Sequence, residues 1–162
     1  MVQIVEATQV DFSIIQALAY SIWNKTYVEI ISKEQIDYML NKGYSLNSLE
    51  DQYTAGHRFI LLKKEEKYIG FASYEHHLEQ KTKLHKLYLE PSEHGQGYGI
   101  LMLDYIKDKA LENKDIALFL NVNKYNKAKF FYEKYGFFVA SETVIDIGNG
   151  FVMDDYIMEY VL

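Results

Sequence analysis

Leu84–Met102, with the sequence LHKLYLEPSEHGQGYGILM, is the stretch that decides the fold. Its apolar first part predicts a strand that stops at Pro91, and a glycine-rich turn then leads into a helix that begins at Gly97. Glycine lets a backbone approach a ligand closely, and the first N–H groups of a helix lack partners within it. The turn is therefore a candidate phosphate site, although a strand-to-helix connection without a ligand would use the same glycines.

Two common phosphate-binding motifs are absent from this turn. The dinucleotide fingerprint G-x-G-x-x-G needs a glycine at a position that Ile100 occupies. The P-loop needs Gly-Lys followed by Ser or Thr, and the turn has no such sequence. The glycine-rich turn therefore belongs to neither of these nucleotide-binding classes.

Hydrophobic periodicity on either side of the turn predicts the other elements. Thr8–Asp11 and Ser32–Gln35 have the form of capping boxes, and each precedes a helical pattern. Residues 41–56 are polar and irregular, which predicts a loop that could hold one more short helix. Strands are predicted at 2–6, 59–62, 68–77, 84–89, 116–122, 137–147 and 151–162, and helices at 12–26, 32–40, 97–113 and 128–136.

The order of these elements predicts one α/β (α+β) domain over residues 1–162. Its central sheet is mixed and mostly antiparallel, has about seven strands and is flanked by helices. The tripeptide Gly148-Asn149-Gly150 supplies the positive-φ residues of a tight hairpin between the last two strands. The sequence contains no linker, internal repeat or low-complexity segment, so we expect no second domain.

The composition excludes several classes of protein. The 162 residues include 23 acidic and 17 basic side chains, with a formal net charge of -6 and no cysteine. Without cysteine there are no disulfides, thiolate metal sites or cysteine nucleophile. The acidic balance argues against a nucleic-acid partner, and no apolar segment is long enough to span a membrane. The N-terminus lacks a signal-peptide pattern, so we expect a cytoplasmic location.

The glycine-rich turn resembles the cofactor-binding signature of the GCN5-related N-acetyltransferases. That signature is Arg or Gln, any two residues, Gly, any residue, then Gly or Ala; the corresponding residues here are His94-Gly95-Gln96-Gly97-Tyr98-Gly99. Both required glycines are present, whereas His94 departs from the expected Arg or Gln. Asn126–Phe137 is similar to a second family motif, which ends in F-Y-x-K-x-G-F. The resemblance extends over residues 59–162, and the first 55 residues match only in having a strand and two helices.

The resemblance implies a fold in which the fourth and fifth strands splay into a V that receives acetyl-CoA. It implies acetyl transfer by direct attack of an amine in a ternary complex. The pantetheine arm would pair with the strand before the turn, and the pyrophosphate would bind amides of the turn. The implied contacts with acetyl-CoA or coenzyme A are Leu87, Tyr88, Leu89, His94, Gly95, Gln96, Gly97, Tyr98, Gly99, Ile100, Asn121, Asn126, Lys129, Phe131 and Tyr132.

Tyr132 occupies the position at which family members protonate the leaving thiolate, so the resemblance implies that it is the general acid. A phenol with a pKa of about 10 stays protonated at neutral pH, whereas the attacking amine must lose a proton. The candidate bases are Glu75, His76, His77 and His85, and we place Glu75 and His85 in the catalytic set; each could instead be a solvated strand residue. Adjacent His76 and His77 point to opposite faces, and no metal site is predicted.

The acceptor is expected to be a small-molecule amine. Ser21–Tyr27 and Ser32–Leu40 look like parts of bacterial members similar to polyamine acetyltransferases, which favours a polyamine-like acceptor. A protein or peptide amine as acceptor, a longer acyl-CoA as donor, and a catalytically silent CoA-binding module are the alternatives. The many aromatic residues would also allow a homodimer.

Overall fold

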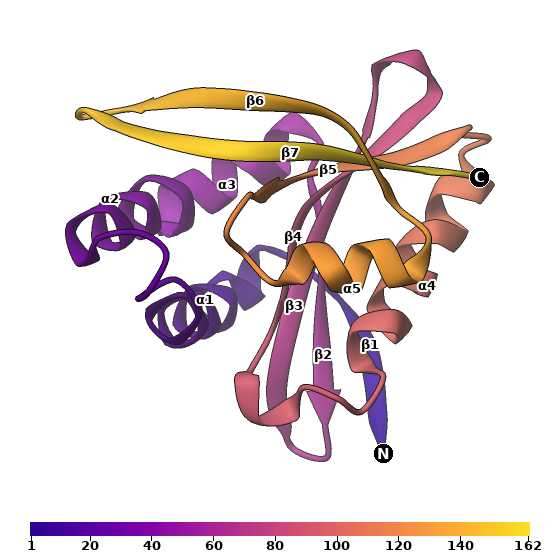
Figure 1. Ribbon diagram of the computed structural model, residues 1–162. Coiled ribbons are helices and arrows are strands. Elements are labelled where there is room, and N and C mark those ends of the chain that lie inside the picture. Colours follow the sequence, from indigo (N-terminus) through magenta and orange to yellow (C-terminus); the bar gives the residue numbers. More distant parts are fainter.

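A seven-stranded mixed sheet runs through the protein, and the computed structural model describes all residues from 1 to 162 (Figure 1). The strands are β1 (Val2–Ala7), β2 (Arg58–Lys64), β3 (Lys67–His77), β4 (Lys81–Leu89), β5 (Ala117–Asn123), β6 (Phe138–Gly148) and β7 (Phe151–Val161). Their spatial order is β1-β2-β3-β4-β5-β7-β6. Every neighbouring pair is antiparallel except β4 and β5, which are parallel. This confirms the predicted sheet.

Helices cover both faces of the sheet (Figure 1). They are α1 (Phe12–Thr26), α2 (Lys33–Tyr44), α3 (Leu46–Ala55), α4 (Tyr98–Glu112) and α5 (Ala128–Tyr135), with 3-10 turns at Gln9–Asp11, Leu78–Gln80 and Pro91–Glu93. On one side, which we call the α1–α3 face, Ile15, Ile36 and Leu49 pack in one buried cluster with residues of β2 and β3. On the other, the α4–α5 face, Met102 and Tyr132 belong to a second buried cluster. No helix has the length and apolar character needed to cross a membrane.

Most of residues 41–56 is helical: the short helix that the sequence allowed there is present as α3, and the expected loop is reduced to the bend at Ser45 and the turn at Gly56. α2 continues to Tyr44, and the Ser45 side chain then caps α3 by accepting a hydrogen bond from the Ser48 N–H at 3.1 Å. α3 ends at Gly56, whose φ of 116° is a left-handed conformation that glycine adopts without steric cost. Only Leu49 of α3 is buried, and the apolar positions Leu46, Leu49 and Tyr53 are separated by polar residues, which makes the segment resemble a loop.

The parallel strands β4 and β5 separate after four residue pairs. Their register runs from Lys81 opposite Ala117 to Leu84 opposite Leu120, and no later residues pair. β4 nevertheless continues to Leu89 and β5 continues beyond its last paired residue. The two strands therefore form the predicted V, with an unpaired backbone edge on each side.

A β-bulge lies where the V begins. Tyr74 of β3 is opposite Leu84, whereas the preceding Ser73 is opposite Lys86, so His85 is an extra residue in β4. The bulge lets two consecutive side chains occupy the same face. His85 contacts Glu75, and Lys86 extends over the ring of Tyr44 on the α1–α3 face.

The β6–β7 hairpin projects beyond β5 and reaches α2 (Figure 1). Tyr38 of α2 donates a hydrogen bond from its hydroxyl to the Ile147 carbonyl at 2.9 Å, and Gln35 donates to the Val152 carbonyl at 2.9 Å. Ser32 caps α2 by accepting from the Gln35 N–H. The Gln35 side chain does not complete the expected capping box, because it joins α2 to the hairpin.

Candidate active site

The glycine-rich turn connects the end of β4 to the start of α4. Gly95 and Gly97 both have φ of 83°, a left-handed conformation that favours glycine. The His94 ring nitrogen Nε2 is 3.1 Å from the Leu89 carbonyl oxygen, so a donated N–H there would hold the turn against the end of β4. His94 therefore has a local structural role in place of the Arg or Gln of the family signature.

Gly99 is needed for close packing between α4 and α5. A Cβ atom at this position would lie 2.9 Å from Cζ of Phe131. Phe131, a predicted cofactor contact, thus packs directly against the glycine-rich turn. This contact fixes the start of α5 relative to the predicted phosphate site.

Hydroxyl and amide groups bridge the open side of the V. The Tyr27 hydroxyl at the end of α1 is 3.2 Å from the Tyr88 hydroxyl on β4. The Asn126 amide donates to the same Tyr27 oxygen at 3.4 Å, and its side-chain oxygen accepts from the Ala128 N–H at the start of α5. Predicted contacts from both arms of the V, Tyr88 and Asn126, therefore meet at Tyr27, which sequence reasoning did not select.

Tyr132 lies on α5, on the α4–α5 face of the sheet. Its ring is buried, with 7% of the residue exposed, and packs edge-on against Phe131 and Phe137. Burial raises the pKa of the Tyr132 hydroxyl, and the nearby Tyr27 raises it further. The hydroxyl is therefore protonated at neutral pH.

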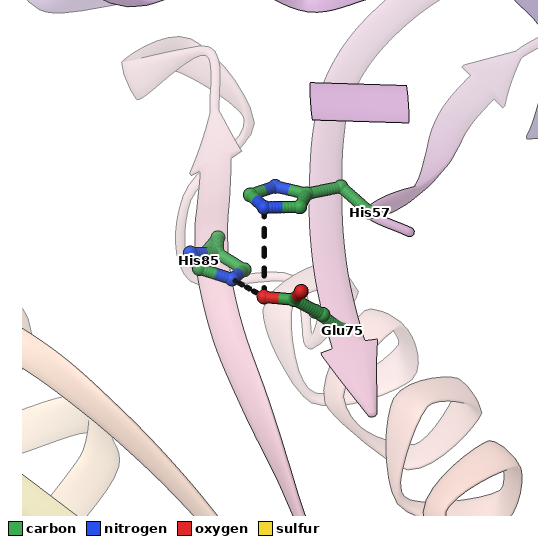
Figure 2. Close-up of side chains that lie close together, drawn as sticks. All are labelled: His57, Glu75 and His85. Carbon is green, nitrogen blue, oxygen red and sulfur yellow. Dashed lines mark hydrogen bonds and ion pairs between the residues drawn. The ribbon is translucent and has the colours of Figure 1, made fainter. Parts of the chain in front are cut away.

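Glu75 and His85, the two predicted members of the base set, are in direct contact. His85 Nε2 is 2.9 Å from a carboxylate oxygen of Glu75, and His57 Nε2 is 3.5 Å from the same oxygen. Figure 2 shows both imidazole rings beside this oxygen. An ionised carboxylate only accepts hydrogen bonds, so His85 donates its Nε2–H and its Nδ1 keeps a free lone pair. Glu75 also lines a pocket of ≈ 430 Å³ between the end of α3 and the strand ends.

The electrostatic surroundings keep His85 neutral and Glu75 charged. Burial lowers the pKa of His85 well below its ordinary value, and Lys83, Lys86 and His57 lower it further against the effect of Glu75. Burial alone would raise the pKa of Glu75, but the hydrogen bond from His85 and the nearby histidines together lower it. Burial likewise lowers the pKa of Lys86 to about 8.

The rings of His57 and His85 are stacked, with centroids 4.0 Å apart and planes 16° apart. Together with Glu75 they place three potential ligand atoms within 4.8 Å of one another. A ring nitrogen binds a metal along a lone pair that lies in the ring plane, at about 2.0–2.1 Å for zinc. Two nearly parallel rings this far apart do not aim at one ion, so the arrangement favours a proton-handling group over a metal site.

The other candidate bases point elsewhere. His76 Nδ1 is 2.8 Å from the Thr82 hydroxyl, and both contact Asp115. His77 packs edge-on against the ring of Phe119. Neither histidine joins Glu75 and His85, which leaves those two as the candidate base.

Two further predicted cofactor contacts have protein partners. Lys129 lies 3.8 Å from Glu133 and over the ring of Tyr156. Asn121 is next to Asp155 and lowers the pKa of that carboxyl group. Sequence reasoning did not select His57, Lys86 or Asp155: His57 and Asp155 come from other parts of the chain, and Lys86, although adjacent to His85, shares its face only because of the bulge in β4.

The chain matches the family described as the acetyltransferase (GNAT) domain over residues 27–159. No curated protein matches it in sequence. It is similar in structure to the PaiA N-acetyltransferase from Thermoplasma acidophilum in complex with coenzyme A, with 24% identity, a TM-score of 0.84, and coverage of 100% of this chain and 99% of that one. At 24% sequence identity, this structural similarity shows that the two chains share a fold.

Two other solved structures share this fold. A chimera of the spermidine N-acetyltransferase SpeG from Vibrio cholerae and hSSAT has 17% identity and a TM-score of 0.72, covering 99% of this chain and 95% of that one. The ribosomal-protein-S18-alanine N-acetyltransferase from Escherichia coli has 18% identity and a TM-score of 0.72, covering 99% and 94%. Together with the match over residues 27–159, this fold shows that the chain belongs to the GNAT acetyltransferase family and is an acyltransferase.

Proposed function

We propose that the protein transfers the acetyl group of acetyl-CoA to the primary amine of a small molecule. The observation that carries this proposal is the unpaired edge of β4 beyond Leu84, which leads directly into the turn at Gly95 and Gly97. An extended pantetheine chain could pair with such an edge, and phosphate groups could bind the amides beyond it. The coenzyme A bound by the PaiA relative supports this choice of co-substrate.

The implied contacts of the co-substrate fall into two groups. Leu87, Tyr88 and Leu89 would pair with the pantetheine, and the turn from His94 to Ile100 would hold the pyrophosphate. The groups across the V would complete the site, namely Asn121, Asn126, Lys129, Phe131 and Tyr132. The backbone of the turn already has the left-handed glycines that a close approach requires.

Tyr132 would assist departure of the thiolate. During transfer, the amine nitrogen forms a bond to the acetyl carbon, the bond from that carbon to sulfur breaks, and the sulfur leaves with the electron pair as a thiolate. An alkyl thiol such as cysteine has a pKa of about 8.5, below that of a phenol. Because burial raises the pKa of Tyr132 further, its main contribution is a hydrogen bond to the developing thiolate.

His85 and Glu75 would take the proton from the amine. His85 lies at the residue where β4 leaves β5, so its position is close to the apex of the V. With Nε2–H donated to Glu75, the free Nδ1 is unprotonated at neutral pH and can accept the amine proton transiently, and Glu75 offsets part of the cost of an imidazolium that burial disfavours. The pocket beside Glu75 gives water access to this pair for release of the proton.

The hairpin favours a small acceptor over a protein acceptor. Its tip is joined to α2 by the hydrogen bonds from Tyr38 and Gln35, so α1, α2 and the hairpin bound the same side of the V. A folded protein would have to displace this connection to present its amine. A polyamine-like molecule would not, and spermidine is the acceptor named for the SpeG relative.

A thiol-release assay with acetyl-CoA across amines, amino acids and peptides tests the function. We expect release of free coenzyme A with at least one small primary amine and none with peptides. Calorimetric titration with acetyl-CoA serves as the binding control. Binding without acetylation of any amine would identify a silent CoA-binding module, and absence of binding would contradict the proposal altogether.

A further inference from the structure

Asp155 of β7 is a buried carboxylate with an unsatisfied oxygen. Only 5% of the residue is exposed, and its Oδ1 has no hydrogen-bond partner. A buried acceptor without a donor costs about 1–3 kcal/mol, and more when the group is charged. A ligand that provides a donor at this position would satisfy the Oδ1 atom of Asp155.

The register places Asp155 next to the V. It lies opposite Asn123, the last residue of β5, and opposite residues of an antiparallel pair share one face of the sheet. Beyond Leu120 the other edge of β5 is unpaired and borders the V. Asp155 is therefore one strand away from the opening, which is about 5 Å. It also lies near Tyr27, whose hydroxyl bridges the arms of the V, and its charge raises the pKa of Tyr27.

Asp155 is not in an ion pair, although Lys83 lies near enough to act on its charge. Burial raises its pKa, the neighbouring Asp154 adds to this, and Asn121 and Lys83 lower it. Lys83 does not form an ion pair with it; the ammonium lies 5.8 Å from the centroid of the Phe119 ring. The site thus combines a carboxylate, an amide and a phenol, and the nearby Lys83 is not paired with the carboxylate.

We propose that Asp155 binds a second, non-reacting ammonium group of the acceptor. This inference rests on the proposed function and names its substrate class: a molecule with two amino groups separated by a short aliphatic chain. The reacting nitrogen must be neutral to attack the thioester, so an ammonium at Asp155 belongs to the other end of the molecule. Asp155 is then a specificity-determining residue that selects diamines over monoamines.

The test compares two probes of equal chain length, 1,4-diaminobutane and 1-aminobutane, by calorimetry on the protein saturated with coenzyme A. We expect the wild type to bind the diamine about tenfold or more tightly than the monoamine, and Asp155→Asn to remove that preference. Asp154→Asn is the matched control, because it removes a carboxylate from the adjacent residue, which points to the other face of β7. It should retain the preference.

Thermal unfolding without ligand separates this role from a structural one. If Asp155 serves a ligand, Asp155→Asn should unfold at the same or a higher temperature than the wild type, since it removes an uncompensated buried charge. A lower unfolding temperature with unchanged diamine preference would assign Asp155 to folding and overturn the inference, as would equal binding of both probes by the wild type. If the protein prefers the diamine but acetylates no amine, the role of Asp155 in binding would be supported and only the proposed acetyl transfer would be contradicted.

Discussion

Gly99 of α4 lies directly against the ring of Phe131 of α5, so closely that a Cβ atom would be 2.9 Å from the ring. Close packing of α4 against α5 therefore requires a glycine at this position of the family signature. Its φ is not in the left-handed region, unlike that of Gly97. The two signature glycines meet different physical requirements.

Gly99→Ala should lower the unfolding temperature and weaken acetyl-CoA binding, because the methyl group displaces Phe131. Alanine in a helix is otherwise favoured over glycine by about 1 kcal/mol, so a loss reports the steric conflict. Phe131→Leu makes room, and the double variant should recover part of the loss in a double-mutant cycle. Simple addition of the two single effects would show that this contact is not the cause.

Tyr132→Phe should reduce kcat by about 100-fold or more while changing the acetyl-CoA affinity little. The expected unfolding temperature is close to that of the wild type. The pKa of the Tyr132 hydroxyl is raised by burial and not by a hydrogen bond, so removing the hydroxyl breaks no hydrogen bond within the protein. Tyr135→Phe on the same helix is the control: its hydroxyl donates to Asp104 at 2.7 Å, away from the V. Steady-state kinetics on both variants is the measurement. An equal loss of kcat in Tyr132→Phe and Tyr135→Phe would show that Tyr132 is not the residue that stabilises the leaving thiolate.

The stability of the protein should fall as the pH is lowered from 7 toward 5. Burial lowers the pKa of His85 and His57 below the ordinary value of 6.5, so the unfolded chain binds protons in this range that the folded chain does not. The contribution of these two neutral histidines to the free energy of unfolding is complete above pH 6.5 and is lost progressively as the pH falls below that value. Unfolding temperatures measured across this range should show a smaller slope for His85→Gln; an unchanged slope would place the proton uptake at other groups.

Gly148→Ala should destabilise the docked hairpin more than Gly150→Ala. Both glycines have positive φ, 90° and 78°, so each alanine costs about 1–2 kcal/mol of backbone strain. At Gly148 the added Cβ would also lie 2.6 Å from the Tyr38 hydroxyl, whereas Gly150 faces open space. We expect a lower unfolding temperature and a higher KM for the amine with Gly148→Ala. Equal effects of the two variants would show that docking on α2 does not bound the acceptor site.

Local patterns were sufficient to predict most of the fold. The alternation and apolar runs of the strands, the glycine-rich turn and the Gly148–Gly150 hairpin depend on residues close in sequence, and the structure has all of them. The bounds of α3 were not predicted, because the polar residues between its apolar positions resemble those of a loop and only Leu49 of this helix is buried. The two motifs identified the family because they specify a turn and a helix start, which are also local features.

The candidate site was predictable only in part. Tyr132 and the turn are fixed by motifs, and Glu75 and His85 were chosen as titratable residues on suitable strands. That these two touch depends on the register in which β3 pairs with β4, including the bulge at His85, and this register has no sequence signal of its own. His57 and Asp155 come from other parts of the chain, and only the register of the complete sheet brings them to the site.

The four-pair ladder between β4 and β5 is the only strand pairing between the two halves of the sheet, and one more backbone hydrogen bond, from Ile116 to the Gln80 carbonyl, lies beside it. The width of the V is therefore set by the crossing angle at a short hinge, whose buried Thr82 and Leu118 lie opposite each other. Changes of volume at this pair would alter the angle without touching any ligand. If both substrates bind in the V as proposed, their affinities would depend on the packing of Thr82 against Leu118 at a joint that neither substrate contacts.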